Sequence, residues 1–292
     1  MFGPLYKVRI NSRTTIRPTN SDIENSKKVL FAIFSRYGDS IISLVVIKEF
    51  IKKYPEKKYL IFCSKQMQPY VLELLPEIDC LTLKKRSIFE LIKAQNLLKK
   101  MKFDIGFNPW SFGLESCYLL TFCNKYQFYK DFKKPKEINH YEVVRKYLNL
   151  DSKDWFVRNI NLKEHYKKIL ICPESTDKNR SISEEQLDEI LTYFKSKYFE
   201  PEITIAAMDN DYFRASHSFF CFKKSSKSSK QFINIMKQNE LVICSDSGPL
   251  HISNSFKKTV IAFFNATSPD LVLNAGDNLK IVSEKINERK VK

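Results

Sequence analysis

Short apolar runs alternate with longer segments of helical periodicity along most of the chain. The runs Val29–Phe34 and Tyr59–Cys63 are continuous and apolar, which is typical of strands buried on both faces of a parallel sheet, and Phe103–Phe107 is a further predicted strand. Between the first two runs, apolar residues recur at helical spacing from Ile41 to Ile51. The first half of the chain therefore predicts strands alternating with helices, as in a doubly wound sheet.

A second alternation of the same kind begins near residue 168. Predicted strands are Lys168–Cys172, Glu202–Ala206, Leu241–Cys244 and Thr259–Phe264, and predicted helices are Ser183–Lys197, Gln231–Gln238 and Leu250–Phe256. The lysine- and serine-rich run at 223–230 is expected to be a solvated loop.

These patterns predict an α/β protein with two facing Rossmann-like domains, mostly parallel sheets and a ligand cleft between them. A basic arm is expected over residues 1–27, an N-terminal domain over 28–160 and a C-terminal domain over 161–292. Two domains also suit the length, because 292 residues exceed what one core usually holds.

Composition narrows the functional classes. The formal net charge of +16 favours anionic partners: a phosphorylated substrate, a membrane surface rich in acidic lipid, or nucleic acid. The basic residues are dispersed and no nucleic-acid-binding motif occurs, so no nucleic-acid partner is expected. The seven cysteines and four histidines show no metal-ligand spacing, which predicts no metal site. Lacking a membrane-spanning run or a signal peptide, the chain is expected to be cytoplasmic.

Three loops carry candidate chemistry, because each follows a predicted parallel strand. The first contains Gly38 and Asp39, the second Lys178 and Arg180, and the third runs from Asp246 to His251. A carboxylate on one domain facing cations and helix N-terminal N–H groups on the other suits group transfer from a phosphorylated donor. The plainer alternatives are helix capping for Asp39 and Asp246, solvation for Lys178, and helix capping or packing for His251.

Four stretches together resemble a known family. They are SRYGDSIISLVVIKEFIKKYP, HYEVVRKYL, PESTDKNRSISEEQL and, most specifically, SDSGPLHISNSF followed by FFNATSP. In this order and spacing they resemble the ADP-heptose:lipopolysaccharide heptosyltransferases of glycosyltransferase family nine, over roughly residues 28–283.

The resemblance implies a GT-B fold and an inverting, metal-independent transfer of heptose from ADP-heptose to a lipopolysaccharide or lipooligosaccharide core acceptor. By the same resemblance Asp39, beside Gly38 in the acceptor-side turn, is the catalytic base. A carboxylate is a weak base, so this role depends on its closeness to the acceptor hydroxyl. Asp246 is then the sugar-binding acid. The implied donor and phosphate contacts are Lys178 or Arg180, with Ser247, Gly248, His251 and Thr267.

The chain also departs from the family pattern. It reads Phe264-Asn265-Ala266-Thr267 where the family usually has an aromatic residue, Gly, Pro and Thr. The identity of the sugar, the acceptor, the linkage and the oligomeric state stay open. So do the role of residues 1–27 and the alternatives of another nucleotide-sugar donor, a nucleic-acid-binding protein or an inactive GT-B scaffold. Peripheral contact with the inner face of the cytoplasmic membrane is an expectation from charge and acceptor type.

Overall fold

The computed structural model describes residues 17–83, 88–133, 138–153, 157–158, 160–163, 165–198 and 200–282. The chain divides into two compact units, residues 1–152 and 153–292. Within the described residues, no helix is long and apolar enough to cross a membrane.

The first unit contains a five-stranded parallel sheet in the order β3-β2-β1-β4-β5. Its strands are β1 (Lys28–Ile33), β2 (Lys58–Cys63), β3 (Asp79–Thr82), β4 (Phe103–Phe107) and β5 (Cys123–Gln127). The chain runs outward from β1 to β3 and then returns to add β4 on the other side of β1. The topological switch point of this sheet therefore lies between β1 and β4.

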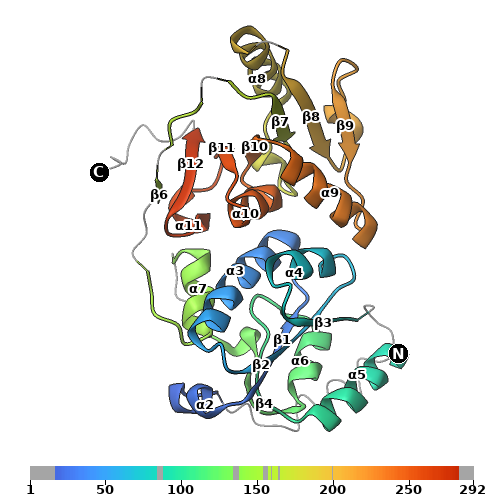
Figure 1. Ribbon diagram of the computed structural model, residues 1–292, viewed down its shortest axis with the longest axis vertical. Coiled ribbons are helices and arrows are strands. Elements are labelled where there is room, and N and C mark those ends of the chain that lie inside the picture. Colours follow the sequence, from blue (N-terminus) through green and yellow to red (C-terminus); the bar gives the residue numbers. More distant parts are fainter. Residues whose placement is uncertain are drawn as a thin grey trace. The chain divides into compact units, whose positions relative to one another are not determined.

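Helices cover both faces of this sheet (Figure 1). The helices are α3 (Tyr37–Lys53), α4 (Gln68–Leu74), α5 (Ile88–Met101), α6 (Leu114–Leu120) and α7 (His140–Tyr147). Helices α5 and α6 share one buried apolar cluster with Leu30, Leu60 and Phe103 of the sheet. On the opposite face, Phe31 packs edge-on against Phe50 of α3, with ring centroids 5.7 Å apart. Burial on both faces explains why the central strands β1 and β2 read as nearly continuous apolar runs.

The second unit contains a seven-stranded sheet in the order β6-β12-β11-β10-β7-β8-β9, and its strand pairs are all parallel. Its strands are β6 (Val157–Arg158), β7 (Lys168–Cys172), β8 (Glu202–Ala207), β9 (Ser218–Cys221), β10 (Leu241–Ser245), β11 (Thr259–Phe263) and β12 (Asp277–Val282). Here the switch point lies between β7 and β10.

The helices of the second unit are α8 (Glu184–Lys197), α9 (Ser226–Gln238), α10 (Gly248–Ser255) and α11 (Pro269–Val272). Helix α8 begins at a capping box, in which the Ser183 hydroxyl and the Gln186 side chain satisfy each other's backbone N–H groups. Its residues Leu187 and Phe194 belong to a buried cluster with Ile169 and Ile243 of the sheet. The predicted class, an α/β chain with two parallel sheets, is confirmed.

The run at 223–230 is not the solvated loop that its composition suggested. Helix α9 begins at Ser226, Ser225 caps it by accepting from the Ser228 N–H, and Ser229 is fully buried. Serine is small enough to be buried when its hydroxyl has a partner, and the Ser229 hydroxyl donates to the Ser225 carbonyl at 3.0 Å. Low complexity therefore concealed a helix start signal.

Three further features differ from the sequence reading or add to it. Residues Asn20–Asn25 form a helix, α2, inside the predicted arm, capped by Thr19 and Asp22. The edge strand β3 was not predicted. The two units divide at residue 152, slightly before the predicted boundary near 160, because β6 pairs with β12 and so draws the connection into the second unit. Residues 1–16 lie outside the described residues.

Candidate functional site

The loops that follow β7 and β10 meet at the switch point of the second unit. The Arg180 guanidinium donates from Nη1 to Oδ2 of Asp246 at 3.4 Å. The Ser175 hydroxyl donates to the Asp246 carbonyl, also at 3.4 Å. Two predicted residues, Arg180 and Asp246, are thus brought into direct contact by segments that are far apart in sequence.

Asp246 is buried, with only 2% of its surface exposed. The helix cap is the next residue, Ser247, so helix capping is not the role of this carboxylate. A buried carboxylate requires a compensating charge, and Arg180 supplies it. Asp177 lies on the other side of the same guanidinium, with its Oδ2 3.7 Å from Nε of Arg180. The two carboxylates share one cation.

Lys178 lies in the same loop, in the short 3-10 helix η2 (Lys178–Arg180). In the part of the chain that the structure describes, its side chain is exposed and forms no ion pair. Arg180 therefore pairs with Asp246, whereas Lys178 forms no ion pair among the described residues.

Helix α10 begins directly after Asp246. Ser247 and Gly248 are half-buried at its N-terminus, where the first N–H groups of a helix point outward and favour an anion. His251 lies one turn further along and is only 5% exposed. The order of strand, acid, serine, glycine and helix is the order that the sequence predicted.

The loop after β11 contacts this site through Asn265, which in the sequence was noted only as a difference from the family pattern. The Asn265 amide donates to the Ser181 carbonyl at 2.9 Å and to Oε1 of Gln186 at 3.1 Å. Both acceptors lie at the start of α8, and Gln186 is also part of its capping box. Asn265 therefore ties the loop containing half-buried Thr267 to the loop containing Arg180. At the position where the family pattern has Gly-Pro, the Asn265 side chain links the two loops by hydrogen bonds.

Glu174 is a second residue that the predicted roles left out. It follows β7, and its Oε2 accepts hydrogen bonds from the backbone N–H groups of Met208 and Asp209. This carboxylate fixes the loop after β8 beside the loop after β7. An acid directly after a strand and a proline was the only sequence signal for it.

In the first unit, Gly38 and Asp39 lie inside the first turn of α3 rather than in a turn before it. The N-cap is Arg36, so Asp39 is not the helix cap. Its carboxylate is half-buried and lies where the helix dipole favours negative charge. It occupies the edge of the sheet at the carboxyl end of β1, next to the switch point.

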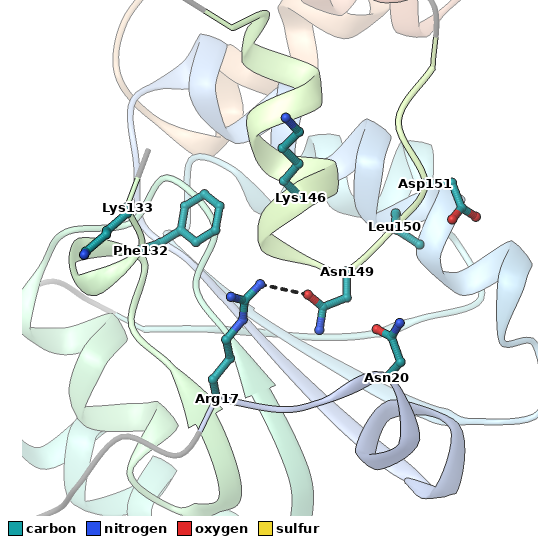
Figure 2. A pocket seen from close by; sticks show the side chains of 8 residues that line it. All are labelled: Arg17, Asn20, Phe132, Lys133, Lys146, Asn149, Leu150 and Asp151. Carbon is teal, nitrogen blue, oxygen red and sulfur yellow. Dashed lines mark hydrogen bonds between the residues drawn. The ribbon is translucent and has the colours of Figure 1, made fainter. Parts of the chain in front are cut away.

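A cavity of about 470 Å³ lies elsewhere in the first unit, near the C-terminal end of α7 (Figure 2). It collects the cations Arg17, Lys133 and Lys146, and Arg17 donates to Oδ1 of Asn149 at 3.1 Å. None of the predicted site residues lines it. Asn149 also donates to the Pro18 carbonyl, so this cluster anchors the segment that leads into α2.

Among the described residues, no group of three or more His, Cys, Asp or Glu side chains could hold a metal ion. Burial raises the pKa of the Cys244 thiol well above its ordinary value, as expected for a packing residue rather than a ligand.

Comparison with known proteins places these features in context. The model of glycosyltransferase family 9 (heptosyltransferase) matches residues 226–292, the segment that contains Asp246, Ser247, Gly248, His251 and Thr267. No curated protein sequence matches the chain significantly.

Solved structures share the fold over most of the chain. A glycosyl transferase family 9 protein from Veillonella parvula superposes with a TM-score of 0.63 at 17% identity, covering 88% of this chain and 86% of its own. ADP-heptose lps heptosyltransferase II from E. coli superposes with a TM-score of 0.64 at 13% identity, covering 87% of this chain and 90% of its own. E. coli heptosyltransferase WaaC, solved with ADP, superposes with a TM-score of 0.59 at 12% identity, covering 88% of this chain and 93% of its own.

At these identities the solved structures establish the fold, while the match over residues 226–292 carries the sequence relationship. The resemblance to glycosyltransferase family 9 that the motifs indicated is therefore confirmed, by that match and by a fold shared with heptosyltransferase structures.

Proposed function

We propose that the chain is an inverting glycosyltransferase that moves heptose from ADP-heptose to a lipopolysaccharide or lipooligosaccharide core acceptor. The observation that carries this proposal is the cluster of Asp246, Arg180 and the α10 N-terminus at the switch point of the second unit. It lies where open α/β sheets bind ligands. Most of it belongs to the segment that matches the family. WaaC, which shares the fold, has been solved with ADP and with ADP-2-deoxy-2-fluoro heptose.

In this proposal the second unit holds the donor. The N–H groups of Ser247 and Gly248 bind the diphosphate, Thr267 adds a hydroxyl, and exposed Lys178 neutralises the charge that grows on the leaving ADP. His251 supports the same end of α10. Asp246, oriented by Arg180, accepts hydrogen bonds from sugar hydroxyls. No residue in this set requires a metal ion.

The first unit holds the acceptor. The Asp39 carboxylate takes the proton of the acceptor hydroxyl while that oxygen forms a bond to the anomeric carbon of the donor. The bond from this carbon to the phosphate oxygen breaks, ADP leaves, and the anomeric configuration inverts. Because a carboxylate is a weak base, the rate depends on how closely Asp39 and the hydroxyl are held.

A donor panel tests the proposal. The thermal midpoint of the full chain is measured with ADP-heptose, ADP-glucose, UDP-N-acetylglucosamine and GDP-mannose, because a ligand that binds only the folded state raises the midpoint. A rise with ADP-heptose, reduced by the substitution Lys178→Met, supports the assignment. A rise with a different nucleotide sugar alone would replace heptose as the transferred group.

The role of Asp39 has its own test. Asp39→Asn keeps the size of the side chain but removes the base, so transfer is expected to be lost while the ADP-heptose midpoint shift persists. Asp79→Asn, at an exposed aspartate of the same unit, is the matched control and is expected to retain transfer. Transfer by Asp39→Asn at the unsubstituted rate would remove Asp39 as the base.

A membrane location follows from the acceptor rather than from any spanning helix. A glycolipid acceptor and a net charge of +16 together favour peripheral binding to an anionic cytoplasmic membrane surface. Flotation with phosphatidylglycerol vesicles, and its loss at high salt, tests this part separately.

A further inference from the structure

The loops that follow β1, β4 and β5 meet at the switch point of the first unit, which is the edge that holds Asp39. The Phe34 N–H donates to the Ser111 hydroxyl at 2.8 Å and so joins the loop after β1 to the loop after β4. Helix α3, with Asp39 in its first turn, begins from the first of these loops. The loop after β4 is therefore a wall of the site that contains Asp39.

A fully buried asparagine fixes the shape of this wall. The Asn108 amide nitrogen donates to the Ser111 carbonyl at 2.8 Å and to the Ser116 hydroxyl at 3.1 Å. Its oxygen accepts from the Tyr129 N–H at 2.8 Å and from the Tyr147 hydroxyl at 3.0 Å. Asn108 thus ties the loops after β4 and β5 to α7. Such a satisfied buried network holds one conformation.

The braced loop presents aromatic side chains in an unusual way. Trp110 has a φ of 52°, a left-handed conformation that a bulky residue rarely adopts. Its ring packs against Tyr129 at 5.3 Å and against His140 at 5.2 Å between centroids. Phe112 packs edge-on against Tyr129 at 5.2 Å, yet it stays 60% exposed. This loop therefore combines a strained backbone at Trp110 with an exposed apolar ring at Phe112.

Tyr129 contacts both of these rings and is only 3% exposed. Within the described residues its buried hydroxyl has no hydrogen-bond partner. Burial, and then the negative charge of Asp39, raise the pKa of Tyr129, so the phenol stays protonated and able to donate at neutral pH. A buried hydroxyl without a partner is rare in folded proteins and calls for an explanation.

We propose that Trp110, Phe112 and Tyr129 form the binding surface for the sugar ring of the acceptor, with the Tyr129 hydroxyl donating to a ligand oxygen beside Asp39. This inference rests on the proposed function and extends it by assigning the acceptor surface. One face of a pyranose ring is lined by C–H bonds, and such a face packs well on aromatic rings, whose faces carry negative potential. One or two polar groups among apolar walls then fix the orientation.

The assignment gives each observed feature a purpose. The strained backbone sets the Trp110 ring beside the strand ends, and the exposed Phe112 ring offers a surface to a ligand. The Tyr129 hydroxyl, which has no partner among the described residues, can donate to a ligand oxygen. An acceptor sugar held on this surface would have its free hydroxyl near Asp39, which is the closeness that a weak base requires.

Intrinsic fluorescence tests binding without any donor. The chain has two tryptophans, so Trp155→Phe leaves Trp110 as the only reporter. The probe is the soluble oligosaccharide released by deacylation of a heptose-free lipopolysaccharide. We expect a saturable change in Trp110 emission, and Phe112→Ser is expected to weaken the apparent affinity at least about fivefold. An emission that stays constant over the titration would overturn the proposal.

A kinetic split tests the individual residues with ADP-heptose as donor. Phe112→Ser is expected to raise the acceptor KM, and Tyr129→Phe to lower kcat/KM for the acceptor roughly three- to tenfold, the effect of one neutral hydrogen bond. Both variants should keep the thermal-midpoint shift that ADP-heptose produces. Tyr129→Phe should also keep the thermal midpoint of the free protein, because the hydroxyl that it removes has no partner in the described part of the chain.

The matched control is Phe89→Ser, which removes a 79% exposed phenylalanine from the start of α5. It should leave the acceptor KM unchanged, and an equal effect from this control would overturn the proposal. ADP binding without any response at Trp110 would remove this inference and leave the donor assignment standing. A saccharide response at Trp110 without any nucleotide-sugar response would remove the proposed function instead.

Discussion

The contact between Arg180 and Asp246 makes a prediction about stability that does not depend on the identity of the substrate. Arg180→Met removes the cation and keeps most of the side-chain volume, leaving a carboxylate that is 2% exposed without its partner. Asp246→Asn removes the negative charge instead. The double variant removes both charges and leaves no buried ion to compensate.

The magnitude follows from the distance and the exposure. Two unit charges 3.4 Å apart attract by about 5 kcal/mol at an effective dielectric constant of about 20. The Arg180 side chain is 28% exposed, so solvent screening reduces the net effect. We expect Arg180→Met to lower the free energy of unfolding by about 2 kcal/mol and Asp246→Asn by about 1 to 2 kcal/mol. The double variant should lose no more than the larger single loss.

The assay is urea denaturation of the full chain and its three variants, followed by far-ultraviolet circular dichroism. The predicted coupling between the two substitutions is at least about 1 kcal/mol. Lys178→Met serves as the control because that side chain is exposed, and it should change stability by less than about 0.5 kcal/mol. Strictly additive losses from the two single variants would refute the view that this pair acts as one unit.

Three further predictions concern other parts of the fold. Gly106→Ala should lower the free energy of unfolding in urea by about 1 to 3 kcal/mol, because the new Cβ would lie 2.6 Å from the Cys123 sulfur. Adding Cys123→Ala to the same chain should recover part of this loss. Additive losses in the double variant would contradict this cause. Hydrogen bonds from Lys125 and Thr19 lower the Asp22 pKa to about 2, so its stabilisation is present above about pH 4 and fades toward pH 2. The thermal midpoint of Asp22→Asn should accordingly lie below that of the unsubstituted chain at pH 6 and converge with it near pH 2, whereas a constant gap would argue against this linkage. Asn265→Ala and Asn265→Asp should both weaken ADP binding in calorimetry, because neither side chain can donate a hydrogen bond to the Ser181 carbonyl. Equal affinities in all three chains would exclude a bridging role.

Local sequence determined most of the elements of this protein. Continuous apolar runs such as Val29–Phe34 indicated buried parallel strands, and the serine and acids at the start of α8 indicated a helix start. The order of acid, serine, glycine and histidine also indicated a strand followed by a helix N-terminus, because these residues are neighbours in the chain. Where the local signal was ambiguous, as in the serine-rich start of α9, burial decided the outcome.

Only the tertiary structure decided which residues meet. The sequence left open whether Lys178 or Arg180 contacts phosphate, and only the folded chain brings Arg180 against Asp246. The aromatic surface of Trp110, Phe112 and Tyr129 comes from the loops after β4 and β5, and only the sheet order brings these loops beside the loop after β1 that leads to Asp39. Strand order and the brace of a buried side chain such as Asn108 are set by packing between distant segments. The physical reason is that local patterns determine which face of an element is buried, whereas its partner is chosen by the packing of the whole chain.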